Sequence, residues 1–522
     1  MAGGRRLLTN LATPRRFGSA RPPRWKVASR RILMMNAAAP LPKDSAELPE
    51  ICGSEDLLDA ARPTEAPPTP GDAGIAWDSV RSVFTIALHM HQPLVPAGGD
   101  DLTTARIISN LQYMMEHLSS GDNHNAPVFH WCYKRMGEFI PELVQAGRQP
   151  RIMLDYSGCL LHGLRQMGLD DGFEKLKLIT CDPRYRHCVE WLGSAWGHAV
   201  APSTPVQDFR LHVQAWRHHF AAIFGAEALC RVQGFSPCEM ALPNHPEVCY
   251  EFLCTLRDCG YRWLLVQEHT VETPAEGRPS EQPYLPHRLV ARDSRGRTIS
   301  MIAIIKTQGS DTKLVGQMQP YYEAKNLGRV ISGGHAVPPL VTQIADGENG
   351  GVMMNEFPPK YRQVMEEASG STTPAVNVSE YLAYLGTLGI RDADFPVLQP
   401  ALQHRIWERF PDGAGPEAME DLITKLRQED ARFNMEGGSW TNNISWVRGY
   451  ENVLDPMRTA SAWFARKVLA PHVSTAEPRY RNALFHLLLT QTSCFRYWGQ
   501  GRWTDYGHEL CRRTMEILRH DF

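Results

Sequence analysis

Two histidines, His89 and His91, follow directly on the apolar run 83–88 and are placed to bind a ligand together. On a β-strand, residues two apart point to the same face, so both imidazoles would face one side. Such a pair can hold a metal ion or a polar ligand. A structural pair, hydrogen-bonded near a turn, is the alternative interpretation of the same pattern.

Four carboxylates occupy similar positions beside apolar segments. Glu239 stands alone in an apolar, proline-bounded segment, and Asp311 follows shortly after an apolar run. Asp346 and Glu348 flank a glycine at the end of a further apolar run. A partly desolvated carboxyl group has a raised pKa and becomes available as a nucleophile or an acid. The plainer interpretations are a glutamate at a helix start, an N-cap aspartate and an ordinary turn.

Paired carboxylates with supporting histidines suit the cleavage of glycosidic bonds. One carboxylate attacks or stabilises the anomeric carbon while the other protonates the leaving oxygen. The same groups equally suit metal-assisted hydrolysis. The chain contains no Gly-x-Ser-x-Gly motif, no P-loop and no Gly-x-Gly-x-x-Gly, so the reactions that depend on these motifs are not indicated.

Several tryptophans near the end of the chain stand beside glycine, asparagine or glutamine. Trp440, Trp498 and Trp503 are of this kind, whereas Trp463 lies among Ala and Phe and is expected in the core. Flat rings beside amide groups suit the apolar faces and the hydroxyls of sugars. We therefore expect the first three rings to contact a carbohydrate.

The elements that must position these groups are short apolar runs separated by helical patterns. Helices are predicted at 102–119 and 246–259, and the strand-like runs are 83–88, 151–155, 262–267, 299–305 and 340–345. Strands separated by helices imply a parallel sheet, either a barrel or a doubly wound sheet. A barrel places its active site at the carboxyl ends of its strands, where the groups above lie.

After about residue 375 the strand signals fade. Helical patterns then occupy 379–388, 397–409, 416–430, 456–469 and 478–496. We divide the chain into a basic leader at 1–43, a disordered acidic and Pro-rich tether at 44–79, a catalytic β/α region at 80–375 and a helical region at 376–522.

The charge of the chain is unevenly distributed. Its 522 residues contain 55 Lys+Arg and 57 Asp+Glu, a formal net charge of −2. Residues 1–43 hold ten basic residues and no acid, so the remainder carries 45 basic and 57 acidic residues. An acidic body argues against a nucleic-acid-binding protein, whose surface needs a basic face.

Membrane insertion and disulfides are not indicated either. No run approaches the roughly 18 uninterrupted apolar residues of a membrane span. The 12 cysteines include no Cys-x-x-Cys pair, which favours free thiols in a reducing compartment.

The leader has two interpretations. The Arg- and Ala-rich composition of residues 1–34 is typical of a transit peptide for a plastid or another organelle. Met34 and Met35 precede an ordinary cytosolic start, so an overextended reading frame on a cytoplasmic protein is the other interpretation. The cytoplasm is our prediction, and the organelle is the alternative.

Five segments of the chain form an ordered set. They are His89-Met90-His91-Gln92-Pro93, Gly197-His198-Ala199-Val200-Ala201-Pro202, Ser236-Pro237-Cys238-Glu239, Ser310-Asp311 with Leu314-Val315-Gly316, and Asp346-Gly347-Glu348-Asn349. Together and in this order they resemble glycoside hydrolase family 57, a group of retaining α-glucan-active enzymes. The resemblance runs from about residue 83 to near the carboxyl terminus.

The resemblance implies an incomplete (β/α)7 barrel, followed by a helical C-terminal region that closes over the cleft. Glu239 would attack C1 of an α-linked glucose, and Asp311 would protonate the departing oxygen and then deprotonate the acceptor. A retaining enzyme needs these two carboxyls about 5–5.5 Å apart, and Glu239 would then raise the pKa of Asp311. The implied sugar contacts are His89, His91, His198, Asp346, Glu348, Trp440, Trp498 and Trp503. An α-glucan is the implied partner, with no cofactor and no metal.

The chain departs from the family pattern at the donor subsite. Ser236 stands where the family usually has tryptophan, Gln308-Gly309 replaces Asn-x-Leu, and Gln317 replaces a common aromatic residue. The glucan, the acceptor and the oligomeric state therefore stay open. Two further functions are compatible with the residues: a metal-dependent carbohydrate deacetylase or mannosidase using His89 and His91, and a non-catalytic glucan-binding protein.

Overall fold

The computed structural model describes residues 48–60, 74–307, 315–348, 355–438, 447–497 and 501–522. Asp311, Trp440 and Trp498 lie outside these ranges, so the predictions made for them have no structural counterpart here. None of the helices in the described ranges is both long and apolar enough to cross a membrane. All 12 cysteines fall within these ranges and are free thiols, as expected.

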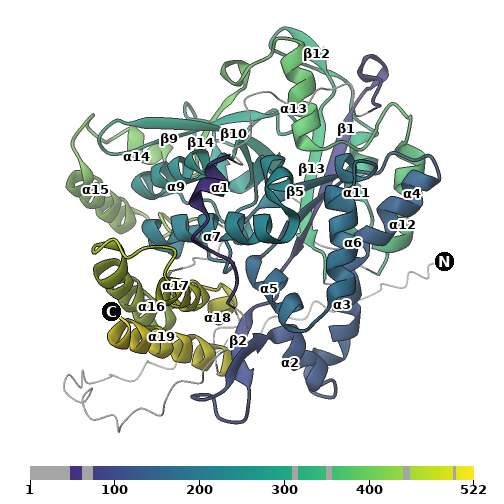
Figure 1. Cartoon of the computed structure of the whole chain (residues 1–522). Helices are drawn as coiled ribbons and strands as arrows, with labels where there is room; N and C mark the ends of the chain where they lie inside the picture. Colours follow the sequence, from purple (N-terminus) through teal and green to yellow (C-terminus); the bar gives the residue numbers. More distant parts are fainter. Residues whose placement is uncertain (1–47, 61–73, 308–314, 349–354, 439–446, 498–500) are drawn as a thin grey trace, which may run out of the picture. The chain divides into compact units, whose positions relative to one another are not determined.

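A closed parallel barrel forms the centre of the described chain (Figure 1). Its strands, in order around the barrel, are β13 (Leu340–Asp346), β1 (Val83–Met90), β4 (Ile152–Tyr156), β5 (Val189–Gly193), β6 (Gly234–Phe235), β7 (Trp263–Gln267) and β10 (Thr298–Lys306). Lys306 of β10 pairs with Thr342 of β13 and closes the ring. The predicted seven-stranded barrel is therefore confirmed.

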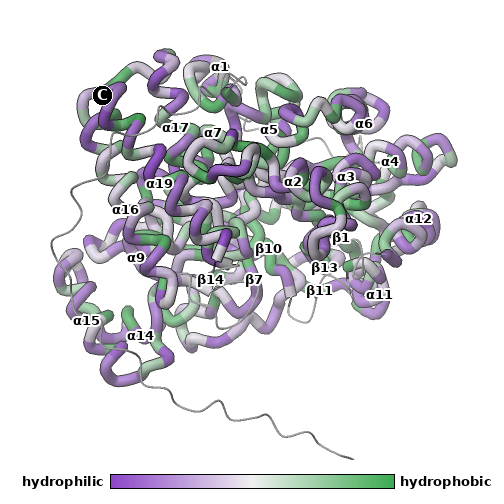
Figure 2. Tube along the Cα trace, turned by 90° about the horizontal axis from the view of Figure 1, so that it is seen from below, coloured by the Kyte–Doolittle hydropathy of each residue, from purple (hydrophilic) through white to green (hydrophobic). Residues whose placement is uncertain are grey.

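The barrel strands read as apolar runs because they are covered on both faces. All residues of β4, β5 and β7 are buried, and seven of the eight residues of β1 are buried. Figure 2 shows hydrophobic residues gathered along the central strands, whereas the outer helices alternate between hydrophilic and hydrophobic.

Helices connect most of these strands. α5 (Gly158–Gln166) and α6 (Asp170–Cys181) lie between β4 and β5, α7 (Val206–Phe224) and α8 (Ala226–Cys230) between β5 and β6, and α9 (Pro246–Asp258) between β6 and β7. β7 and β10 are instead joined through β8 (Val271–Glu272) and β9 (His287–Arg292), and β9 runs antiparallel to β10. α11 (Gln319–Ala324) and the hairpin β11 (Val330–Ser332) with β12 (His335–Val337) precede β13.

Three sequence predictions were wrong in detail. The range 102–119 contains β3 (Arg106–Ser109), which pairs with β2 (Leu94–Gly98), and only then the short helix α2 (Asn110–Glu116). The range 397–409 begins with β14 (Val397–Pro400), which pairs with β9, and continues as α14 (His404–Trp407). The strands β5 and β6 were not predicted, because β6 has two residues and β5 contains a buried glutamate.

Between β1 and β4 lie two more helices, α3 (Ala126–Lys134) and α4 (Met136–Gln145). After β13 come α12 (Phe357–Ala368) and α13 (Val378–Thr387). A capping box of Asn377 and Glu380 starts α13, and Glu380 also accepts hydrogen bonds from the buried Arg151 next to β4. Tyr381 and Leu385 of α13 pack in the core with side chains of the barrel strands.

The C-terminal region is helical, as predicted. It contains α15 (Pro416–Glu429), α16 (Glu451–Phe464), the π-helical turn η9 (Ala465–Leu469), α17 (Pro478–Thr490), α18 (Cys494–Tyr497) and α19 (Arg502–His520). α16, α17 and α19 pack against one another, and α17 also contacts α7 (Figure 1). The predicted helix at 478–496 is interrupted at residues 491–493, between α17 and α18.

Parts of the segment 44–79, predicted to be a disordered tether, have defined structure. α1 (Glu55–Ala60) contacts α7, and Ile51, Cys52 and Leu58 are buried. Trp77 in the short helix η2 (Trp77–Ser79) stacks on Tyr384 of α13 at 4.2 Å. The boundary proposed at residue 375 stays a prediction, and β14 beyond it still belongs to the sheet.

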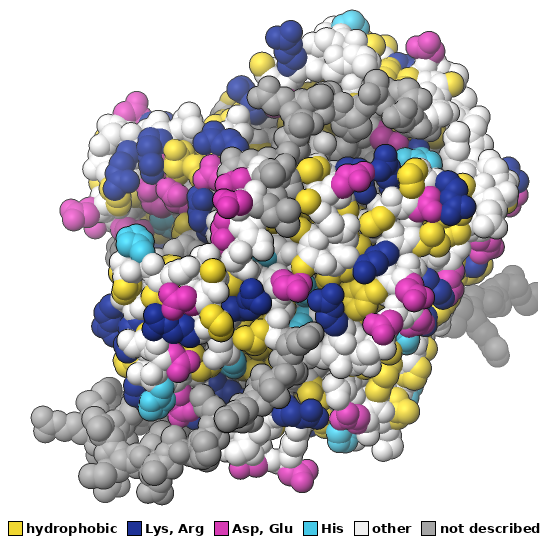
Figure 3. All heavy atoms as spheres, in the orientation of Figure 1, with side chains coloured by type: hydrophobic (Ala, Val, Ile, Leu, Met, Phe, Trp, Pro, Cys, Tyr) yellow, Lys and Arg dark blue, Asp and Glu magenta, His cyan; other side chains and the backbone are white. Residues whose placement is uncertain are grey.

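On the face drawn in Figure 3, lysine and arginine side chains lie among aspartate and glutamate side chains. No single sign of charge dominates the described surface on this face.

Candidate active site

Three polar side chains lie at the same level of the barrel, at the carboxyl ends of neighbouring strands. Two of them were predicted from the sequence, and the third, Asp155, was not. His89 on β1 is in register with Asp155 on β4 and with Asp346 on β13. In a parallel barrel such residues face a common end, which is where active sites form. The fold therefore brings a histidine and two carboxylates together.

The imidazole of His89 is charged at neutral pH. Burial lowers the pKa of His89. The carboxylate of Asp155, 2.8 Å from Nδ1, raises it, and the charges of Asp346 and Glu348 raise it further, so that the pKa is about 10. Both ring nitrogens then carry protons. Nδ1–H donates to Asp155, and Nε2–H donates to Nε2 of His198 over 2.9 Å.

His198 follows β5 in a left-handed backbone conformation with a φ of 56°. Burial lowers its pKa well below the usual range, and the neighbouring His91 and His89 lower it further, so His198 is neutral. Its ring stacks on that of His91 with 4.0 Å between the centroids. Because Nε2 accepts a hydrogen bond from His89, the proton of the neutral His198 lies on Nδ1, and Nδ1–H donates to Oγ of Ser493 over 2.7 Å.

Glu239 follows β6 in a tight turn and is also left-handed, with a φ of 59°. Non-glycine residues in this region carry a strain of about 1–3 kcal/mol each, which is typical of functional sites. Its side chain is 14% exposed, and Oε1 accepts a hydrogen bond of 3.2 Å from Ser493. Burial lowers the pKa of the nearby Arg496 to about 10, and the charge of Glu239 acts in the opposite direction.

A second group of contacts surrounds His91. Nδ1 lies 2.7 Å from Oγ of Ser157, the N-cap residue of α5, and Nε2 lies 3.4 Å from Sγ of Cys494. The backbone N–H of His91 donates to Oε1 of Glu348 over 2.9 Å. Burial, and then the charge of His89, lower the pKa of His91 well below its usual range, so its imidazole is neutral.

Asp346 and Glu348 form an acidic pair on the loop after β13. Desolvation at the end of the barrel raises the pKa of Asp346, the cation of His89 opposes this rise, and the charge of Asp155 adds to it. Burial and the charge of Asp346 raise the pKa of Glu348 to about 8. Glu348 is therefore largely protonated at neutral pH, while its Oε2 has no hydrogen-bond partner among the described residues.

The segment between α17 and α18 supplies several of these partners from the C-terminal region. Gln491 anchors it, because Nε2 donates to Asp208 over 2.6 Å and Oε1 lies 2.8 Å from Nε2 of His212. The N–H of Ser493 donates to the carbonyl of His198. The preceding residue of that loop, Gly197, lies so close to α17 that a Cβ there would be 2.5 Å from the carbonyl oxygen of Leu488.

All six ring nitrogens of His89, His91 and His198 are engaged by protein groups. A metal ion would need a free lone pair, and none of these rings offers one here. Within the described ranges, no three His, Cys, Asp or Glu side chains are arranged to hold a metal ion.

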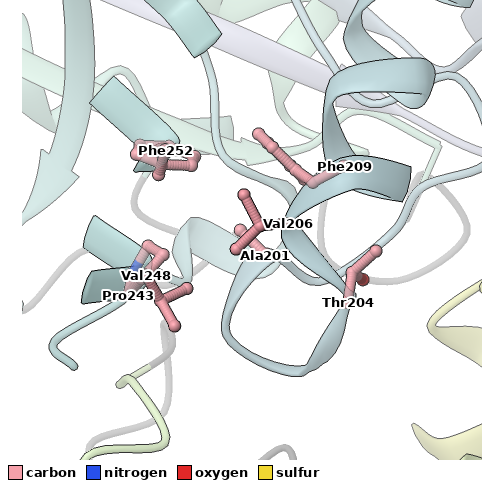
Figure 4. A pocket seen from close by; sticks show the side chains of 7 residues that line it. All are labelled: Ala201, Thr204, Val206, Phe209, Pro243, Val248 and Phe252. Atoms are coloured by element: carbon pink, nitrogen blue, oxygen red, sulfur yellow. The ribbon is translucent and has the colours of Figure 1, made fainter. Parts of the chain in front are cut away.

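Two hollows of the described surface are lined by residues outside this cluster. Figure 4 shows a cavity of about 10 Å³ between α7 and α9, lined by Ala201, Thr204, Val206, Phe209, Pro243, Val248 and Phe252. Such a volume holds at most about one water molecule, and the lining is apolar, so it is a packing gap and no sugar site. A hollow of about 410 Å³ is lined by Arg427, Ala431, Phe433, Glu436 and Arg448.

Sequence reasoning brought His89, His91, His198, Glu239, Asp346 and Glu348 to one site but missed several partners. Asp155 ends a predicted strand, and this position was the available signal. Ser493 lies where the predicted helix is interrupted, Arg496 lies in α18, and nothing in the sequence pattern marked either of them. Trp503 lies in the first turn of α19, half-buried and edge-on to Tyr506 at 5.9 Å, and its contact with sugar stays a prediction.

Comparison with known proteins identifies the family of the chain. Residues 85–387 match the family model described as glycosyl hydrolase family 57. A comparison with curated proteins finds no match. Among solved structures, the chain is similar to the 4-α-glucanotransferase from Thermococcus litoralis, with 14% identity and a TM-score of 0.52. The likeness covers 85% of this chain and 60% of the glucanotransferase, so the chain spans three fifths of that protein's length.

Two weaker structural likenesses have a TM-score of 0.45. One is to a branching enzyme from Pyrococcus horikoshii, with 12% identity over 84% of this chain and 89% of that one. The other is to an α-amylase from Thermotoga maritima, with 11% identity over 84% of this chain and 93% of that one. The family model alone covers more than half of the sequence. The chain belongs to glycosyl hydrolase family 57.

Proposed function

We propose that the protein is a retaining glycoside hydrolase or glucanotransferase that acts on α-glucans. The observation that carries the proposal is Glu239, held by Ser493 at the carboxyl end of a barrel strand and beside Arg496, in a member of glycosyl hydrolase family 57. A carboxylate fixed in this way is suited to attack C1 of an α-linked glucose and form a covalent glycosyl-enzyme intermediate.

Asp311 is the proposed general acid/base. It would protonate the departing oxygen in the first step and deprotonate the acceptor in the second. Water as the acceptor gives hydrolysis, and a sugar hydroxyl gives transfer or branching. Asp346 and Glu348, together with the edges of the histidine rings, are proposed to contact the sugar at the cleavage point.

Product analysis tests this proposal. The protein is incubated with maltoheptaose and with amylose, and the products are separated by chain length and branch linkage. Glucose and maltose indicate hydrolysis, longer and shorter linear chains indicate transfer, and new α-1,6 links indicate branching. Proton NMR of the first product should show the α-anomer, whereas a β-anomer would contradict the covalent route.

Substitutions identify the residues. Glu239→Gln and Asp311→Asn are each expected to lower turnover by a factor on the order of 10³ or more, with the fold intact. The matched control is Glu190→Gln, another buried barrel glutamate, which pairs with Ser379 and not with the site. Full activity in either of the first two variants would rule out the proposed roles.

A further inference from the structure

A continuous line of hydrogen bonds runs from a buried carboxylate to Glu239. It passes through Asp155, His89, His198, Ser493 and Glu239, with successive distances of 2.8, 2.9, 2.7 and 3.2 Å. Four of its members belong to the ends of barrel strands or the loops after them, and Ser493 comes from the C-terminal region. The line therefore joins the barrel to the helical region through the side chain proposed as the nucleophile.

From His89 onward, the proton donors along this line point toward Glu239. The doubly protonated His89 donates to His198, which leaves His198 with its proton on Nδ1. That proton is donated to Oγ of Ser493, so the single hydroxyl proton of Ser493 is left for Oε1 of Glu239. A serine hydroxyl normally rotates among partners, but here its direction is set by the two histidines.

We propose that Ser493 is a positioning residue for the nucleophile: oriented by His89 and His198, its hydroxyl holds Oε1 of Glu239 and keeps the carboxylate ionised for attack. The inference rests on the proposed function, in which Glu239 attacks the sugar. A hydrogen bond to the charged form of a carboxyl favours that form. Loss of the donor should therefore make Glu239 harder to ionise.

Other charged or titratable groups also face Glu239. His198 Nδ1 lies 3.8 Å from Oε1, and the charge of Glu239 acts on Arg496 and on the Cys494 thiol of α18. His198 is neutral and the burial of Cys494 raises its pKa, so Arg496 is the cation among them. Arg496 is unchanged in the variants below, which leaves the serine donor as the difference.

The first experiment is a pH profile of kcat/KM on maltoheptaose. Ser493→Ala is expected to lower kcat/KM between about 10- and 100-fold and to move the acidic limb about one unit to higher pH. Ser493→Thr, which keeps a hydroxyl, should restore both. Thr492→Val is the matched control, because the Thr492 hydroxyl is buried in the same segment but donates to the carbonyl of Leu489.

An unshifted acidic limb in Ser493→Ala would overturn the proposal. So would a shift of equal size in Thr492→Val, since the effect would then come from loosening the segment. Failure of a folded Ser493→Thr variant to restore the profile would likewise count against it.

The second experiment does not depend on activity. Protein labelled with ¹⁵N-histidine is compared by NMR with and without Ser493→Ala, and His198 is assigned through His198→Gln. The proposal expects an Nδ1-protonated His198 whose Nδ1 resonance moves in Ser493→Ala. An Nε2-protonated His198 overturns the proposal even if the enzyme cleaves α-glucan. The expected spectrum in a protein without glucan activity would uphold the hydrogen-bond line and reject only the proposed function.

Discussion

The charge on His89 depends on one buried neighbour, Asp155, whose carboxylate is 1% exposed and lies 2.8 Å from Nδ1. Without that neighbour, burial would favour the neutral ring, because a charge inside a protein is poorly solvated. The direction of every hydrogen bond that leads to Glu239 follows from this single protonation state. Substitutions of Asp155 and of the acidic pair should therefore change how stability depends on pH.

Asp155→Asn is expected to return the pKa of His89 toward its ordinary value of 6.5 from about 10. A raised pKa in the folded state adds stability that is complete below pH 6.5 and is lost as the pH rises through about 10. In urea unfolding between these limits, the wild type should lose stability with rising pH and Asp155→Asn should lose much less.

The control for this comparison is Asp171→Asn, which removes an exposed carboxylate paired with Lys134. It should retain the wild-type dependence on pH. If Asp155→Asn also retains that dependence, His89 is not the group responsible.

Glu348→Gln tests the acidic pair. The pKa of Glu348 rises from 4.5 to about 8 in the fold, so its contribution to stability is complete below pH 4.5 and is lost through about pH 8. Glutamine imitates the protonated acid and can still accept the N–H of His91. The variant should therefore be close to the wild type at pH 5 and more stable than it at pH 9, as measured by urea unfolding. Marked destabilisation at pH 5 would show that Glu348 is ionised in the fold.

At the scale of elements, the site depends on the close approach of the loop after β5 to the end of α17. The loop carries His198, the segment after α17 carries Ser493, and Gly197 is the point where the two backbones nearly touch. Only glycine fits there, because any Cβ would meet the backbone oxygen of Leu488.

Gly197→Ala should push these two elements apart. We expect a loss of about 1–3 kcal/mol in the free energy of unfolding, together with a loss of activity, since Ser493 would move from His198. Gly386→Ala in α13 is the control, because a Cβ at Gly386 meets no atom within 4 Å. That variant should gain up to about 1 kcal/mol and keep its activity, since alanine favours helix. Equal stability of both variants would contradict the close packing at Gly197.

Sequence periodicity predicted the long elements well and the short ones poorly. Five of the barrel strands were found because each is an apolar run buried on both faces. The strand β6 has two residues and shows no period, so only the position of Glu239 after it could have marked it. The strand β3 was predicted as part of a helix, because its residue Ile107 continues into α2 at helical spacing.

The residues of the site could be predicted where they lie at or just after the end of a barrel strand in the sequence. His89, Glu239, Asp346 and Glu348 are of this kind. Ser493 was not predictable, because it lies in a break of a predicted helix and acts only through tertiary contact with His198. A lone serine has no spacing that distinguishes it from any other serine on a surface.

At the scale of the whole molecule, Gln491 links the helical region to the barrel. It is fully buried, and its side-chain amide forms hydrogen bonds with both Asp208 and His212 of α7. Burial raises the pKa of Asp208 to about 6 and lowers that of His212 to about 4, so both groups need their amide partner.

Gln491→Leu should leave both α7 groups unpaired and cost about 2–4 kcal/mol in the free energy of unfolding. Tryptophan fluorescence and far-ultraviolet circular dichroism should still report one shared transition at a lower urea midpoint. Gln363→Leu, on the exposed face of α12, should change stability by less than about 0.5 kcal/mol. Two separate transitions in the wild type would show that the barrel and the helical region unfold independently.

The hydrogen bond between Ser493 and Glu239 spans 254 positions of the chain, and this separation has a consequence during synthesis. A ribosome adds about 5–20 residues per second, so Glu239 is made about 13–50 s before Ser493. During this interval the growing chain carries the carboxylate without the hydroxyl that orients it. Under the proposed function, a nascent chain would lack this positioning hydrogen bond until its last helices have been made and have docked.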